Sequence, residues 1–104
     1  RGGVIAFSAR PRTPIGLARY VRLADFDTAE AAVEVVDAWQ RRGVGWALLW
    51  ELREQALRAG IRRLVATMLR DNRGALALAH RLGVTSTLSV QRTEMEVLIE
   101  LGAS

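Results

Sequence analysis

The 104-residue sequence contains no cysteine and no lysine, and it has one histidine and two prolines. Without cysteine, the chain can form no disulfide framework and offers no thiolate nucleophile. A single histidine without cysteine argues against a zinc site, so we expect no metal. No apolar run approaches the length that spans a bilayer, and we expect no signal peptide. The sequence therefore favours a cytoplasmic protein that does not associate with a membrane.

Arginine supplies every basic side chain, and the net charge is +4 at pH 7. The arginines are spread along the chain, and the three tryptophans lie near the middle of the sequence rather than on a basic strand. Nucleic-acid binding is therefore not expected, because it favours clustered charge interleaved with exposed aromatic residues. The basic balance suits a phosphorylated small-molecule ligand instead.

Length and composition indicate one domain over residues 1–104, and a hydrophobic fraction of 50% is sufficient for a core. Hydrophobic periods and turn residues predict strands at 4–9, 15–23, 29–36, 62–69, 85–90 and 94–101, and helices at 46–59 and 73–82. The first three strands most simply form an antiparallel meander, and helix 46–59 links strand 29–36 to strand 62–69 in a right-handed parallel crossover. The expected fold class is α/β (α+β), a mixed, mostly antiparallel sheet with a central parallel β-α-β unit and helices packed on it. Gly60 and Gly83 are expected to end the two helices.

The segment Gln40-Arg41-Arg42-Gly43-Val44-Gly45-Trp46 is the most informative feature of the chain. It connects an expected strand to an expected helix, so several backbone N–H groups remain unpaired at the positive end of the helix dipole. Such a turn binds anions, and phosphate is the commonest of them. Gly43 and Gly45 can adopt positive φ and allow a ligand close to the backbone. Arg41 and Arg42 add guanidinium donors that suit phosphate oxygens.

The spacing of these glycines fits neither of the two best-known phosphate loops. An ATP-binding P-loop requires G-x-x-x-x-G-K-[ST], and a dinucleotide fingerprint requires a third glycine. The pattern Q-x-x-G-x-G instead resembles the pyrophosphate loop of the GNAT superfamily of N-acetyltransferases. The expected order β-β-β-α-β-α-β-β also resembles the GNAT order, from the family's second strand to its end.

The resemblance implies a GNAT-like domain that lacks the family's opening elements. Family members begin with a strand and two helices that form part of the acceptor pocket, and nothing in this sequence matches them. We therefore expect either a fragment of a longer protein or a natural truncation. Arg1 in place of an initiating methionine favours the fragment.

The run from Ala29 to Gln40 resembles the A-E-x-A-V…W-Q run of bacterial Pat-type protein lysine acetyltransferases. This resemblance makes Glu30 the candidate general base. A base is useful because a lysine side chain, with a pKa of about 10.4, is almost entirely protonated at pH 7 and the attacking amine must be neutral. Glu34 shares the strand parity of Glu30 and stays the alternative for this role. Both carboxylates could instead be solvated or paired with arginine.

The resemblance also implies where acetyl-CoA, the co-substrate, would bind. In the family, the loop amides hold the pyrophosphate, and this role transfers to the backbone of Arg41, Arg42, Gly43, Val44, Gly45 and Trp46. The preceding strand would pair with the pantetheine arm through the backbone of Val33, Glu34 and Val35. Asn72 would lie near the pantetheine or the phosphates, and it could also cap the helix that follows it. Ala79 stands where many family members have a tyrosine that protonates the leaving thiolate, and His80 is expected to be a surface residue.

The sequence thus predicts an acetyl-CoA-dependent N-acetyltransferase that transfers the acetyl group directly to an amine in a ternary complex. The Pat-like run suggests a protein lysine as the acceptor. Two alternatives stay open: a small-molecule amine acetyltransferase, and a catalytically weak acyl-CoA-binding regulatory domain. A homodimer and a fusion to a regulatory domain are the assemblies that we consider.

Overall fold

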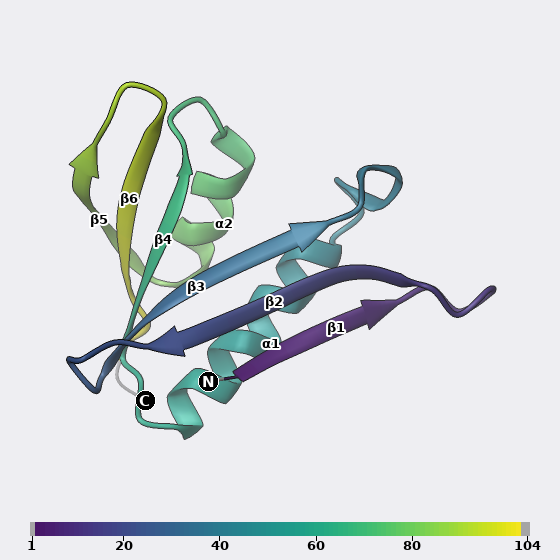
Figure 1. The fold of residues 1–104 in the computed structure, drawn as a ribbon, viewed down its shortest axis with the longest axis horizontal. Helices are drawn as coiled ribbons and strands as arrows, with labels where there is room; N and C mark the ends of the chain where they lie inside the picture. The colour runs from purple at the N-terminus through teal and green to yellow at the C-terminus, as the bar shows by residue number, and fades with distance from the viewer. Residues whose placement is uncertain (1, 103–104) are drawn as a thin grey trace.

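A sheet of six strands carries two α-helices on one of its faces in the computed structural model, which describes residues 2–102 (Figure 1). The strands are β1 (Gly2–Phe7), β2 (Pro14–Arg22), β3 (Thr28–Val35), β4 (Arg63–Leu69), β5 (Val84–Val90) and β6 (Glu94–Glu100). The helices are α1 (Val44–Arg58) and α2 (Arg73–Leu82), and a 3-10 turn, η1 (Asp37–Trp39), precedes α1. Every predicted strand and helix is present, although the first strand begins and ends two residues earlier than predicted.

The strands lie in the order β1-β2-β3-β4-β6-β5, and β3 and β4 are the parallel pair within residues 2–102. The remaining neighbours are antiparallel, and β1 to β3 form the predicted meander. Parallel neighbours need a long crossover connection, and α1 supplies it between β3 and β4. The predicted mixed, mostly antiparallel sheet with a central β-α-β unit is therefore confirmed.

The apolar side of α1 faces the sheet and forms the centre of the core. Leu48, Leu49, Leu52 and Ala56 are all buried, and their spacing places them on one side of the helix. They belong to one cluster with buried residues from both helices and from the strands, among them Ala18, Ala29, Leu64, Ala79, Leu82, Val97 and Ile99. Within the described chain, no helix has both the length and the apolar character needed to cross a membrane.

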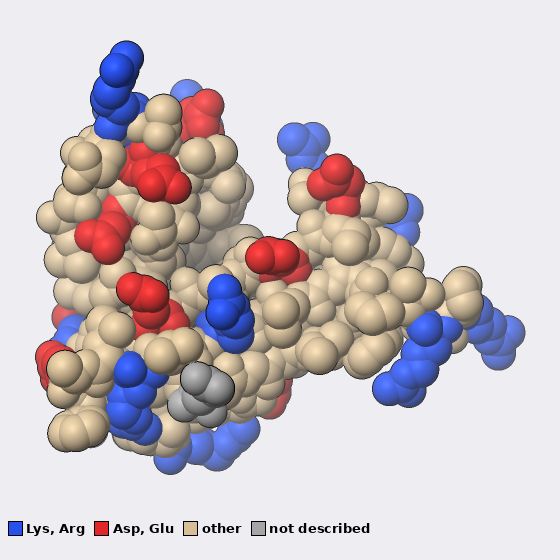
Figure 2. Space-filling model, in the orientation of Figure 1, with Lys and Arg blue, Asp and Glu red and all other residues tan. Residues whose placement is uncertain are grey.

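No helix of the described chain covers the opposite face of the sheet, which points toward the reader in Figures 1 and 2. Ile5, Leu17 and Val21 on this face are 54%, 38% and 41% exposed. The strand register places Glu34 beside Leu17 and Glu30 beside Val21. Carboxylates therefore share this open face with apolar side chains.

Both helices end at the predicted glycines, but only the first of these has left-handed backbone. Gly60 follows α1 with a φ of +87°, a conformation that favours glycine. Gly83 follows α2 with a φ of 175°, which is extended backbone that any residue can adopt. A Cβ atom on Gly83 would lie 1.8 Å from the backbone carbonyl oxygen of Glu100 on β6. Gly83 thus ends α2 as predicted, and close packing against β6 is what requires a glycine there.

We expect Gly83→Ala to lower the free energy of unfolding by about 1–3 kcal/mol, because the backbone of β6 must move to admit the methyl group. Gly74→Ala in α2 is the matched control, since the nearest atom to its new Cβ is Asn72 Oδ1 at 3.6 Å. Alanine at that position should leave the free energy of unfolding unchanged or raise it by about 0.5–1 kcal/mol. Urea denaturation measures both changes, and equal stabilities for the two variants would contradict the crowding at Gly83.

Candidate functional site

The two parallel strands at the centre of the sheet separate before they end. The ladder between β3 and β4 runs from Thr28 to Ala31 on β3, whereas the ladder between β3 and β2 continues to Val35. Residues 32–35 therefore have a strand partner on the β2 side and none on the β4 side among the described residues. This stretch presents backbone groups without a strand partner to a cleft, as an exposed sheet edge does, and the carbonyl oxygen of Val35 accepts a hydrogen bond of 3.0 Å from Gln40 Nε2.

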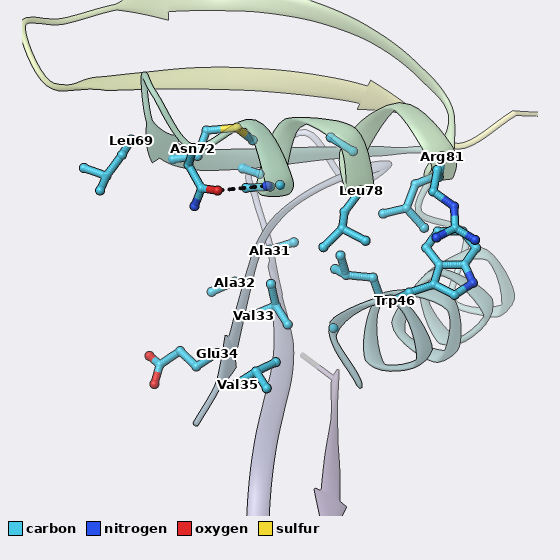
Figure 3. A pocket seen from close by; sticks show the side chains of 18 of the residues that line it. Ala31, Ala32, Val33, Glu34, Val35, Trp46, Leu69, Asn72, Leu78 and Arg81 are labelled. Atoms are coloured by element: carbon cyan, nitrogen blue, oxygen red, sulfur yellow. Dashed lines mark hydrogen bonds between the residues drawn. The ribbon is translucent and has the colours of Figure 1, made fainter. Parts of the chain in front are cut away.

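The cleft has a volume of about 1050 Å³ and lies between the separated strands, the start of α1 and the whole length of α2 (Figure 3). Its walls include most of the residues that the sequence proposed for cofactor binding: Val33, Glu34, Val35, Arg41, Gly43, Gly45, Trp46 and Asn72. Arg42, Val44 and Glu30 are not among the lining residues. The structure thus brings the proposed strand, loop and helix-cap residues together around one opening.

The loop between η1 and α1 turns through left-handed backbone at Arg41 and Gly43, whose φ angles are 63° and 81°. The sequence identified Gly43 and Gly45 as residues that can adopt positive φ; Gly43 does so, whereas Gly45 is part of α1. A Cβ on Gly45 would lie 3.5 Å from Leu78 on α2, which is an ordinary van der Waals distance, so the two helices lie close together at the head of the cleft without requiring glycine there. Left-handed backbone at a non-glycine residue has no sequence signal comparable to glycine, so the turn at Arg41 was missed.

The first turn of α1 leaves its amides available. Helix geometry gives no intrahelical acceptor to the N–H groups of Val44, Gly45 and Trp46, and no side chain caps the helix at Gly43. The first backbone bond that closes the helix runs from Ala47 N–H to the carbonyl oxygen of Gly43 at 3.0 Å. These free donors combine with the positive end of the dipole of a fifteen-residue helix, which makes an anion site at the mouth of the cleft.

Asn72 caps α2, and it is one of the two residues, with Asp71, that the sequence offered for this role. Its Oδ1 accepts a hydrogen bond of 3.0 Å from the backbone N–H of Ala75, and its side chain lies on the wall of the cleft opposite Glu34 (Figure 3). One asparagine therefore both fixes the start of the helix and faces the cavity.

Two carboxylates of β3 occupy different places relative to the cleft. Glu34 lies on its wall, beside the stretch of β3 that has no partner. Glu30 lies further back along the strand, where its neighbours in the ladders are Val21 and Val65. Both side chains are exposed, and neither forms an ion pair within residues 2–102.

Two positions of α2 that the sequence singled out, Ala79 and His80, contribute no polar group to the cleft. Ala79 is buried in the core at 3% exposure, so it offers no proton donor. His80 is exposed, as expected, and its Nδ1 lies 2.7 Å from the hydroxyl of Thr85 rather than in the cleft. Within residues 2–102, no group of His, Cys, Asp and Glu side chains gathers as a set of metal ligands.

An arginine that the sequence reasoning missed lies beside the head of α1. The guanidinium carbon of Arg81 on α2 is 3.8 Å from the centre of the Trp46 ring, and both residues line the cleft (Figure 3). No local sequence pattern indicates this pair, because the two residues belong to different helices and are 35 positions apart.

This arrangement of a split sheet, a free helix start and a facing helix cap agrees with the comparisons to known proteins. Residues 3–84 match the Acetyltransferase (GNAT) family, and the chain therefore belongs to that family. No curated protein matches the chain.

Three solved structures illustrate the similarity. The GNAT domain of PAT from S. lividans is 30% identical, with a TM-score of 0.75 over 88% of this chain and 56% of that one. The yncA protein from Salmonella typhimurium, solved with its cofactor acetyl-CoA, is 24% identical, with a TM-score of 0.72 over 88% of this chain and 61% of that one. The paiA N-acetyltransferase from Thermoplasma acidophilum, solved with coenzyme A, is 17% identical, with a TM-score of 0.77 over 94% of this chain and 59% of that one. The chain thus spans less than two thirds of the length of each of them, and the two less similar structures bear on the fold alone.

We expect Asn72→Ala to lower the free energy of unfolding by about 1 kcal/mol, because the N–H of Ala75 loses its acceptor. Asn72→Asp keeps an oxygen at the cap and should retain most of the stability at neutral pH. Thermal denaturation of both variants measures the contribution of the cap. If the aspartate variant were as unstable as the alanine variant, the contribution of Asn72 to stability would not come from helix capping.

Proposed function

We propose that this domain is an acetyl-CoA-dependent N-acetyltransferase that transfers an acetyl group directly to an amine. The observation that carries the proposal is the free amide cluster at the head of α1, which opens onto a cleft that continues along the unpaired stretch of β3. A ligand with an anionic group would bind the amide cluster through that group. An extended chain with amide groups attached to it would then pair with the backbone of β3.

The phosphate end of the cofactor would bind at the loop. The backbone of residues 41–46 donates to the pyrophosphate, and Arg41, which lines the cleft, adds a charged donor. Two structures similar in fold to this chain hold acetyl-CoA or coenzyme A, which supports the same class of ligand here.

The pantetheine arm would lie along β3 like an added strand. Val33, Glu34 and Val35 offer their backbone on the side where β4 has moved away, and Asn72 faces them across the cleft. An arm that starts at the loop and follows β3 places the acetyl end near residues 31 and 32, where the two strands come together.

The reaction that this placement supports is attack by a neutral amine on the thioester carbonyl. The nitrogen forms the new C–N bond, the C–S bond breaks, and the electron pair leaves with the thiolate of coenzyme A. The chain has no cysteine that could carry the acetyl group as a thioester. We therefore propose direct transfer, without a covalent enzyme intermediate. With alanine at position 79, the proton on the departing sulfur comes from solvent.

We propose Glu30 as the base that takes the proton of the amine, with Glu34 as the alternative. The Pat-like run selects Glu30, and so does the expected position of the acetyl end near residues 31 and 32. Glu34 lines the cleft but lies nearer the end that would hold the pyrophosphate. The same run, together with the 30% identity to the S. lividans PAT domain, supports a protein lysine as the acceptor.

Calorimetric titration with acetyl-CoA tests cofactor binding, and a pair of glycine variants tests the loop. Gly43 and Gly60 both have left-handed backbone and no atom within 4 Å of the place that a Cβ would take, so alanine strains each equally, by about 1–2 kcal/mol. Gly43→Ala should weaken acetyl-CoA binding about tenfold or more, whereas Gly60→Ala should leave binding unchanged. The absence of binding to the folded wild type would refute the proposal, and equal affinities for the two variants would refute the loop assignment.

A pH–rate series on two glutamine variants tests the base. Glu30→Gln should reduce acetyl transfer to a lysine peptide by about 10²–10⁴-fold near neutral pH and by less at high pH, where more of the amine is already neutral. Acetyl-CoA affinity should change little, because the cofactor uses the backbone of β3. Glu34→Gln is the matched control and should be milder. The reverse ranking would assign the base to Glu34, and binding without transfer to any amine would favour an acyl-CoA-binding regulatory domain.

A further inference from the structure

Charged side chains of both signs line the cleft, because Glu34, Asp71 and Glu94 lie on its walls as well as three arginines. Among residues 2–102, the ion pairs are formed by Arg53, Arg58 and Arg63. The arginines on the cleft wall are Arg41, Arg73 and Arg81, and none of them takes part in these pairs. A ligand with more than one anionic group would therefore find more than one cation in the cleft.

Arg81 differs from the other two arginines because its position is held by a ring. Its guanidinium lies against the Trp46 ring (Figure 3), 3.8 Å from the ring centre. The ring of Trp50 lies on the same helix at a centroid distance of 5.6 Å from that of Trp46. Stacking uses the flat face of a guanidinium and leaves its N–H groups pointing outward from the edge. The side chain is thus oriented with its donors free for an acceptor in the plane of the group.

The place of this stack relates it to the loop. Trp46 belongs to the first turn of α1, whose amides form the anion site, and its ring reaches from there toward the last turn of α2. Because Arg81 covers one face of the indole, that face cannot serve as a platform for a nucleotide base. Arg42 also stacks on a tryptophan, Trp39, at 4.9 Å, but neither of these two residues lines the cleft.

We propose that Arg81, positioned by Trp46, binds a phosphate monoester on the ribose of the nucleotide cofactor and so selects a cofactor that carries it. The inference rests on the proposed function, which places a pyrophosphate on the amides beside Trp46. A ribose joined to that pyrophosphate brings its own substituents one sugar further on, and the stack of Arg81 on Trp46 lies beside the same amides on the cleft wall. In coenzyme A the group concerned is the 3′-phosphate, which the loop amides and Arg41 would leave without a partner.

The test compares coenzyme A with 3′-dephospho-coenzyme A, two ligands that differ only in this phosphate. Calorimetry at low ionic strength should give wild-type protein an affinity for coenzyme A about tenfold higher, and added salt should reduce that preference. Arg81→Gln should bring the ratio of the two dissociation constants to about one, mainly by weakening coenzyme A. Arg62→Gln is the matched control, because it removes the same charge at the residue just before β4 begins, outside the cleft lining. It should keep the wild-type ratio.

A second variant separates position from charge. Trp46→Leu keeps Arg81 but removes its support, so the preference should fall about threefold while the net charge stays the same. Wild-type protein that binds both ligands equally would overturn the inference and leave the proposed function intact. An unchanged ratio in Arg81→Gln would overturn the assignment to Arg81. Folded protein that binds neither ligand would overturn the proposed function and this inference together.

Discussion

The separation of β3 from β4 after Ala31 is the constraint on which the site depends. In a parallel pair in the middle of a sheet, the backbone hydrogen-bonding groups of both strands are normally paired along their length. Here half of β3 has no such pairing on the side of β4. The loss is tolerable because β2 still pairs with the same residues and because the core beneath them is anchored by the buried leucines of α1. A continuous ladder would be more stable in isolation, but it would close the cleft.

The same crossover that makes the split possible also sets the position of the anion site. The chain must leave the end of β3, turn, and re-enter along the sheet as α1, so the helix start lies at the mouth of the opening. Gly43 and Arg41 supply the left-handed turns that lead into α1. The positions of β3, the loop and the two helices therefore all depend on this crossover, and a shift of one element would move the others.

Most of the fold could be predicted from the sequence, because strand alternation, helix periodicity and the glycine-bearing loop are local signals. The cap at Asn72 was predictable for the same reason, since its partner is three residues away. What the sequence could not provide depends on pairs of distant residues. The crowding of Gly83 against Glu100 and the stack of Arg81 on Trp46 arise where elements cross. Whether Glu30 or Glu34 faces the acetyl group depends on where the arm ends, which residue spacing does not encode.

The basic residues on the cleft wall are all arginines, and this affects how they react with an acyl donor. An ammonium group loses its proton readily enough to attack an acyl donor, whereas a guanidinium stays protonated at any physiological pH and is a poor nucleophile. Arg41, Arg73 and Arg81 can therefore surround an activated thioester without consuming it. Since these 104 residues include no lysine, no lysine side chain of the domain competes with the external amine, and acetyl-lysine found after a reaction must lie outside this sequence.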